Sequence, residues 1–246
     1  GIFRDVTVRI CPPDHVKPNT FFIRTLEASD KLARMAVSFE WRGGVSNFIF
    51  TVESPRLWTP ESPSLYELEI FGEKFRYGIR TIKFDPQKGF FLNGVHRQMR
   101  GVCMHHDLGP IGAAFDRDFA RRQIAILKEM GCDSIRTAHN PPAAALLDLC
   151  DEMGMMVMDE AFDMWESPKT EYDYGRYFND WYQKDVASWV RRDRNHVSLI
   201  MWSIGNEIAD ELLEHGKTLA EKLVKICHEE SPDRTLTCAI NHQQAE

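Results

Sequence analysis

The second half of the chain alternates between segments typical of buried strands and segments typical of amphipathic helices. Repeated βα units of this kind predict a parallel sheet with helices packed on it, and both a doubly wound sheet and a βα-barrel fit the alternation. No G-x-G-x-x-G motif follows the first strand and no Walker loop is present, which favours the barrel over nucleotide-binding folds. The expected elements are strands 98–103, 134–138, 155–159, 198–205 and 235–240, and helices 116–130, 141–153, 175–193 and 210–229.

Residues that begin and end helices mark two of these segments. Asp116 is expected to cap the first helix and Gly131 to end it. Asn140 and Pro141 suit the N-cap and the first position of the second helix, which Gly154 would end. The helix at 210–229 is expected to bury Leu212, Leu219, Leu223 and Cys227.

The first 85 residues follow a different period. Apolar residues alternate with polar ones in short runs separated by Pro, Gly and Asn, which is typical of an antiparallel β-sandwich. The sequence FFLNGV at 90–95 adds an Asn-Gly hairpin signal. We therefore expect two domains, a sandwich over 1–85 and an α/β domain over 86–246. The expected sandwich strands are 6–10, 35–41, 47–52, 66–70 and 75–79.

Composition limits the classes of partner. The net charge is −7 and there is no basic tract, so nucleic acid is not an expected partner. No apolar run approaches the roughly 18 residues that a membrane span needs, and the first residues do not form a signal peptide. Six scattered cysteines without a C-x-x-C pair fit neither a disulfide scaffold nor a zinc ribbon. Cellular location and a homo-oligomeric state are left open.

Polar side chains collect where four successive predicted strands end. The tips read MHHD at 104–107, RTAHN at 136–140, MDEA at 158–161 and SIGNE at 203–207. The last follows the run LIMWSIG, so Asn206 and Glu207 end a segment suited to burial, where an unpaired charge is costly. Because barrel enzymes place their chemistry at the carboxyl ends of strands, these tips predict an active site.

The same segments carry a resemblance to a known family. MRGVCMHHDLGP, IRTAHNPP, VMDEAFDMW and RRDRNHVSLIMWSIGNE resemble the successive barrel motifs of family 2 glycoside hydrolases, the β-galactosidase and β-glucuronidase group. RLWTPESPSLY followed by YGIRTIKFD resembles the end of that family's immunoglobulin-like domain, and GIFRDV the last strand of its N-terminal sugar-binding-like domain. The resemblance implies an immunoglobulin-like sandwich, with that preceding strand at 1–10, followed by the first five βα units of a TIM (β/α)8 barrel.

The resemblance also implies roles for individual residues. Retaining hydrolysis of a glycoside needs two carboxyl groups about 5–5.5 Å apart, and Glu207 matches the general acid/base. Its pKa must be raised, and we expect Trp202 and the barrel core to wall the site. Asn206 matches the residue that hydrogen-bonds the sugar 2-hydroxyl. The other implied substrate-binding residues are Asp107 and His139 on further hydroxyls, and Arg136, which matches an arginine that orients the nucleophile.

Other interpretations of these motifs remain. His105, His106 and Asp107 could bind a metal, although adjacent strand residues point to opposite faces. Asp159 and Glu160 could be a second catalytic pair, but a structural role bonding neighbouring strands is favoured.

The aromatic and metal positions are also open. Trp165 is either a stacking platform for a sugar or a core residue, and we include it among the substrate-binding residues. Galactosidases of the family bind magnesium through a Glu and a His just after the third strand. Those positions hold Met164 and Glu166 here, so the usual ligands are not matched; we expect no cofactor, and magnesium stays open as an alternative.

The family's nucleophile is a Glu on a later barrel strand, and no acid after Glu207 matches it. The acids that follow are Asp210, Glu211, Glu214, Glu221, Glu229, Glu230, Asp233 and Glu246. Five strands are counted where a closed barrel needs eight. We therefore expect part of a longer retaining β-glycosidase, most simply a β-galactosidase, whose substrate is a β-linked glycoside or oligosaccharide. The alternatives are a β-glucuronidase, a β-mannosidase or a non-catalytic carbohydrate-binding relative.

Overall fold

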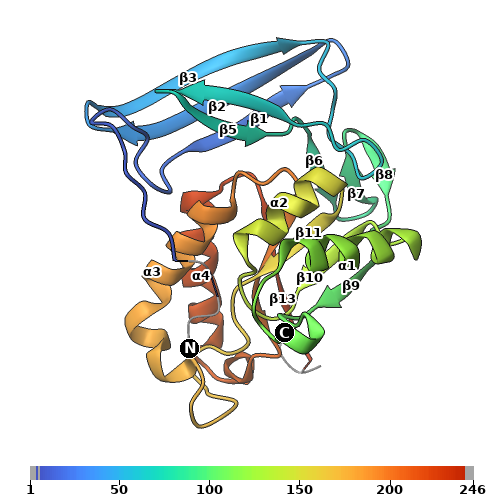
Figure 1. Ribbon diagram of the computed structural model, residues 1–246. Helices are drawn as coiled ribbons and strands as arrows, with labels where there is room; N and C mark the ends of the chain where they lie inside the picture. The colour runs from blue at the N-terminus through green and yellow to red at the C-terminus, as the bar shows by residue number, and fades with distance from the viewer. Residues whose placement is uncertain (1–3, 5, 242–246) are drawn as a thin grey trace.

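The computed structural model describes residue 4 and residues 6–241. A β-sandwich lies across one end of an α/β part that contains a parallel sheet and four α-helices (Figure 1). No helix in the described chain is long and apolar enough to cross a membrane.

The sandwich consists of a three-stranded and a two-stranded antiparallel sheet. The first sheet has the order β1-β2-β3, from Phe22–Ala28, Leu32–Trp41 and Gly44–Glu53. The second pairs β4 (Tyr66–Ile70) with β5 (Glu73–Tyr77). In β2 every second residue is buried, as the period of a strand with one core face requires. The core between the sheets includes Met35, Val37 and Phe39 of β2 and Tyr77 of β5.

Two details of the sandwich differ from the sequence prediction. The described residues 6–10 form no strand, and Val6, Val8 and Ile10 are 77, 89 and 94% exposed, so the expected first strand is wrong for them. No strand of the described chain pairs with this segment, so it lacks the ladder that a strand requires. The earlier part of GIFRDV, residues 1–3 and 5, lies outside the described residues. Strand β1 was not predicted, because a bulge between Thr25 and Glu27 breaks the alternation of FIRTLEA.

A small antiparallel sheet connects the two parts. It contains β6 (Ile82–Asp85), β7 (Gly89–Leu92) and β8 (Val95–Arg97), and the predicted Asn93-Gly94 turn between β7 and β8 has φ of 52° and 77°. Phe90 and Leu92 pack with Trp58 and with residues near the starts of two parallel strands. The hairpin therefore covers the amino end of the parallel sheet. The carboxyl ends of the parallel strands lie at the opposite end of that sheet.

The parallel strands follow each other in chain order. They are β9 (Gly101–Met104), β10 (Ser134–Thr137), β11 (Met156–Glu160), β12 (Leu199–Asn206) and β13 (Thr235–Ala239). Each pairs in parallel with the next, so the order never reverses. A doubly wound sheet would contain a reversal, whereas successive barrel strands do not. This order confirms the five predicted βα-barrel strands.

Four helices cover the outside of the parallel sheet. They are α1 (Arg117–Glu129), α2 (Ala144–Met153), α3 (Gly175–Asp193) and α4 (Gly216–Glu230), and α3 and α4 lie side by side (Figure 1). Asp116 caps α1 as predicted, because its carboxylate accepts hydrogen bonds from the backbone nitrogens of Asp118 and Phe119. Gly131 follows α1 with φ of 90°, and Gly154 ends α2 in the left-handed conformation.

The starts of two helices differ from the prediction. Ala143 is the N-cap of α2, so Asn140 and Pro141 lie in the loop that connects the end of β10 to the helix. The segment predicted as one helix from 210 contains a short 3₁₀ turn, η2 (Ala209–Leu212), and then α4. Because η2 precedes the helix, Leu212 is 52% exposed, and Leu219, Leu223 and Cys227 alone supply the predicted stripe.

Candidate active site at the strand ends

The buried carboxylate of Glu160 is the centre of a network that joins three strands. Its side chain at the end of β11 is 0% exposed. Arg136 of β10 donates to both oxygens, from Nε at 3.0 Å and from Nη2 at 2.8 Å. His139 Nδ1 lies 3.0 Å from Oε1, and Ser203 Oγ of β12 donates to Oε2 at 2.5 Å. Both oxygens are therefore fully engaged, and the charge is balanced by Arg136.

Glu160 also raises the pKa of Arg136. Burial acts to lower the pKa of Arg136, but the hydrogen bonds and charge of Glu160 outweigh it, and the pKa is raised. The neighbouring Asp159 lies on the opposite face of β11, where burial and then the Asp193 carboxyl raise its pKa well above the ordinary value. The two acids therefore cannot act as one catalytic pair on a substrate. Glu160 bonds neighbouring strands, as the favoured interpretation of the sequence holds.

Asn206 is held by hydrogen bonds at both ends of its amide. Its Oδ1 accepts from Arg136 Nη2 at 2.7 Å, and its Nδ2 donates to Asp163 Oδ1 at 2.9 Å. Lys169 donates from Nζ to the same Asp163 oxygen at 2.7 Å and to the Asn206 carbonyl at 2.9 Å. The residue is 5% exposed, and these contacts fix which way its side-chain amide faces.

Glu207 leaves the strand in a different backbone conformation from the residues before it. Its φ is 48°, in the left-handed region that non-glycine residues seldom adopt, and its backbone nitrogen donates to the Ala239 carbonyl at 2.7 Å. The residue is exposed, unlike the eight buried residues of β12. Such conformations are concentrated at functional sites, where neighbouring structure holds them.

Trp202 does not wall this site. Its ring packs edge-on against Trp189 of α3, with centroids 4.7 Å apart, and is fully buried. Because Ser203 faces Glu160 inside the sheet, its neighbour Trp202 faces the helices. The prediction that Trp202 surrounds Glu207 is therefore wrong.

Of the predicted residues at the first two strand ends, His139 contacts Glu160 and Asp107 does not. His139 reaches Glu160, and its ring contacts the ring of His105 edge-on at 5.1 Å. Asp107 is exposed, and its carboxylate accepts a hydrogen bond from the Gly109 nitrogen at 2.7 Å. Its carboxylate thus bonds within the β9 loop, while its backbone carbonyl accepts a hydrogen bond from Gln123 Nε2 of α1 at 3.3 Å, and neither contact involves Glu160.

The histidine pair does not form a metal site with Asp107. His106 Nδ1 lies 3.2 Å from Arg4 Nη2, while His105 packs on His139, so the two rings point apart. Burial, followed by the charge of Arg4, lowers the pKa of His106. Within the described chain the one group of three potential metal ligands is elsewhere, at Glu166, Asp210 and His215.

Trp165 is a core residue, so its assignment to substrate binding is wrong. It is 2% exposed, and its Nε1 donates to the Ile204 carbonyl at 2.8 Å. The ring joins the loop after β11 to the outer face of β12, and a sugar cannot reach it. Met164 lines a cavity of about 340 Å³ with Phe162 and Trp189. Its thioether is not a ligand for magnesium, which prefers oxygen, so one of the two magnesium positions of the related galactosidases holds no ligand here, while the other holds the carboxylate of Glu166.

Sequence reasoning missed three contributors to the network: Asp163, Lys169 and Ser203. Asp163 follows Glu160 by three residues in the motif DEAFDMW, which was the available signal. The path of the loop after β11 decides that this carboxylate returns to Asn206, and no periodic pattern predicts such a path.

These observations define a class first. Five successive barrel strands, a hairpin over their amino end and a carboxylate network at their carboxyl end form part of a βα-barrel. Residues 85–246 match the model described as glycosyl hydrolases family 2, TIM barrel domain, and residues 19–74 match a second model described as glycosyl hydrolases family 2. The chain belongs to glycosyl hydrolase family 2.

Individual relatives agree with this assignment. The chain is 52% identical over 170 residues to a β-galactosidase, BoGH2A, of Bacteroides ovatus, covering 65% of this chain and 20% of the relative. It is 34% identical over 261 residues to a putative β-glucuronidase of Formosa agariphila, covering 89% and 25%. The chain thus spans a quarter or less of these relatives' lengths.

Solved structures show the same likeness. A family 2 member from Bacteroides cellulosilyticus superposes with a TM-score of 0.89 at 30% identity, covering all of this chain and 39% of that one. A β-glycosidase from Bacteroides vulgatus gives 0.82 at 35% identity, covering 92% and 34%.

Proposed function

We propose that the chain is part of a retaining β-glycosidase that removes terminal β-linked sugars, in which Glu207 is the general acid/base. The observation that carries the proposal is the placement of Glu207 at the end of β12, exposed and directly after the doubly anchored Asn206. An acid that protonates a leaving oxygen has to be accessible to substrate, and Glu207 is. Glu160 is not, since it is buried and its oxygens are occupied.

A retaining mechanism needs a second carboxylate about 5–5.5 Å from the first. Among residues 4 and 6–241, Glu160 is the other glutamate at the end of a parallel strand, and its four contacts make it a poor nucleophile. We therefore propose that the nucleophile is a glutamate outside residues 1–246. Arg136 would orient it, in addition to the contact of Arg136 with Asn206.

The remaining polar groups are proposed to hold the sugar. Asn206 would bind the 2-hydroxyl, a contact that strengthens in the transition state. His139, whose side chain is 24% exposed, and Asp107 would hold other hydroxyls. We propose no cofactor for the hydrolysis, and neither nucleic acid nor membrane as partner. Cellular location and oligomeric state are not assigned.

We favour a β-galactoside as substrate, since the relative at 52% identity is named a β-galactosidase. β-Glucuronidase is the second candidate, because several relatives bear that name. The test is hydrolysis of nitrophenyl β-galactoside, β-glucuronide and β-mannoside by the protein with its complete barrel. Preference for the galactoside is expected, and turnover of none of the three would favour a non-catalytic carbohydrate-binding relative.

Asp163 and Lys169 should affect catalysis through Asn206. Asp163→Ala removes an acceptor from the Asn206 amide and should lower kcat/KM about tenfold or more, because a hydrogen bond to a charged group contributes about 1.5–3 kcal/mol. Lys169→Met should act in the same direction. The loss should be much smaller on a 2-deoxy substrate, as it should be for Asn206→Ala. Lys222→Met, at an exposed position on α4, is the control. Equal losses on both substrates would show that the pair is merely structural.

A further inference from the structure

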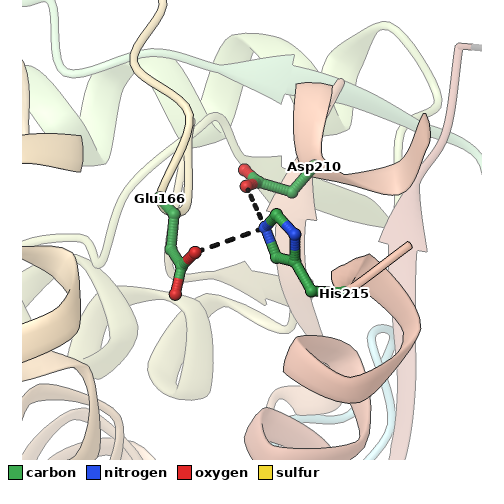
Figure 2. A group of neighbouring side chains, drawn as sticks. All are labelled: Glu166, Asp210 and His215. Atoms are coloured by element: carbon green, nitrogen blue, oxygen red, sulfur yellow. Dashed lines mark hydrogen bonds and ion pairs between the residues drawn. The ribbon is translucent and has the colours of Figure 1, made fainter. Parts of the chain in front are cut away.

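Three potential metal ligands meet beside the segment that follows Glu207. Glu166 lies on the loop after β11, Asp210 in η2 and His215 at the N-cap of α4. Both carboxylates point toward the imidazole of His215 (Figure 2). His215 Nε2 lies 3.2 Å from Glu166 Oε2 and 3.3 Å from Asp210 Oδ1, and one ligand atom from each residue lies within 4.8 Å of the others.

These separations suit a shared cation. Nitrogen and carboxylate oxygen ligands bind zinc at about 2.0–2.2 Å, which in a tetrahedral site places neighbouring ligands roughly 3.3–3.6 Å apart. The two nitrogen–oxygen distances, 3.2 and 3.3 Å, lie at or just below that range, and the two carboxylates lie within 4.8 Å of each other, so a modest shift of the side chains would bring all three onto one ion.

The charges around the cluster also favour a cation. The Asp210 side chain is 0% exposed, and its oxygens accept hydrogen bonds from the backbone nitrogen and hydroxyl of Ser167. In the part of the chain that the structure describes, no lysine or arginine forms an ion pair with Glu166 or Asp210. With a neutral imidazole the cluster carries a charge of −2, and with a protonated one −1. A divalent ion would neutralise it, and a buried carboxylate is stabilised by such a partner.

We propose that Glu166, Asp210 and His215 bind one divalent transition-metal ion, such as Zn²⁺ or Mn²⁺. Two carboxylate oxygens with one imidazole nitrogen suit these ions, because imidazole is a common ligand of zinc and carboxylate a common ligand of manganese. Glu166 and His215 are 30% and 48% exposed, which leaves room for water to complete the coordination.

The site would join two loops of the active-site end. One leads from β11 and contains Asp163 and Lys169, and the other leads from Glu207 to α4. The ion would hold the segment after Glu207 against the loop that fixes Asn206. It would stabilise this arrangement and take no part in bond cleavage.

The test uses the protein with its complete barrel, stripped of metal with a chelator and then titrated with Zn²⁺ and, separately, with Mn²⁺. Bound metal is counted by elemental analysis, affinity is measured by calorimetry, and Mn²⁺ is followed by electron paramagnetic resonance. Glu166→Gln and His215→Ala should each remove one bound equivalent or weaken its binding about 100-fold, since even outer partners of ligands contribute 10–100-fold. His228→Ala, at an exposed position on α4, should bind as the unmodified protein does.

The competing arrangement is a protonated His215 that bridges the two carboxylates without an ion. It predicts that the unmodified protein, Glu166→Gln and His215→Ala bind the same number of ions with the same affinity, and this result would overturn the proposal. Glu166 and His215 are partly exposed, and the buried Asp210 carboxylate keeps its hydrogen bonds from Ser167 in both variants, so both should fold.

Discussion

Glu207→Gln should lower kcat/KM about 10²–10⁴-fold for glycosides with poor leaving groups, in the protein with its complete barrel. These substrates need a proton on the departing oxygen, and the amide cannot supply it. Dinitrophenolate departs without protonation. With a dinitrophenyl glycoside, the first step, which forms the glycosyl-enzyme, should therefore proceed within about tenfold of the normal rate. Rapid-mixing measurement of the dinitrophenolate burst separates that step from the later hydrolysis.

Glu214→Gln provides the control for this substitution. Glu214 is exposed and lies on the same segment, seven residues after Glu207, so the same chemical change there should leave both substrate types unaffected. An equal loss for good and poor leaving groups in Glu207→Gln would instead assign Glu207 a role other than proton transfer.

Glu160→Gln should be the most destabilising of the substitutions considered. The change keeps the size of the side chain but leaves Arg136 without its counter-charge, and it places an amide N–H₂ against groups that donate to Glu160. Breaking a buried ion pair by removing one partner costs about 3–5 kcal/mol of the free energy of unfolding. Chemical denaturation measures this loss, and activity should fall too, because Arg136 orients Asn206.

Glu67→Gln is the matched control for stability. Glu67 forms an ion pair with Lys74 on the surface of the sandwich, and both side chains are more than half exposed. Exposed pairs contribute little, so no measurable change is expected there. If Glu160→Gln were equally neutral, the network around Glu160 would not hold the strand ends together.

The elements that the sequence predicted well are those with one strong period or one clear boundary residue. The apolar run of β12 and the capping aspartate of α1 are examples, because burial and capping act locally. The bulged strand β1 escaped prediction since its alternation is interrupted. The start of α2 was misplaced because an Asn-Pro pair also suits a loop.

The site was predicted in part for a related physical reason. The strand ends could be located from the apolar patterns of the strands. In the structure, Arg136, His139 and Asn206 at these ends belong to one network. The direction in which a tryptophan on a loop points depends on the path of that loop. Trp165 therefore had two interpretations before the structure showed it bonded to Ile204. Asp163 and Lys169 became visible only through the folded loop.

The most direct measurement of the proposed role of Glu207 uses Glu207→Ala with an activated aryl β-glycoside and sodium azide. If Glu207 is the acid/base of a retaining enzyme, the variant forms its glycosyl-enzyme intermediate but hydrolyses it slowly. Azide needs no general base, so it should restore turnover and yield the β-glycosyl azide, identified by proton NMR. Formation of the α-glycosyl azide would show that Glu207 is the nucleophile. Absence of any rescue would contradict a role for Glu207 in both steps.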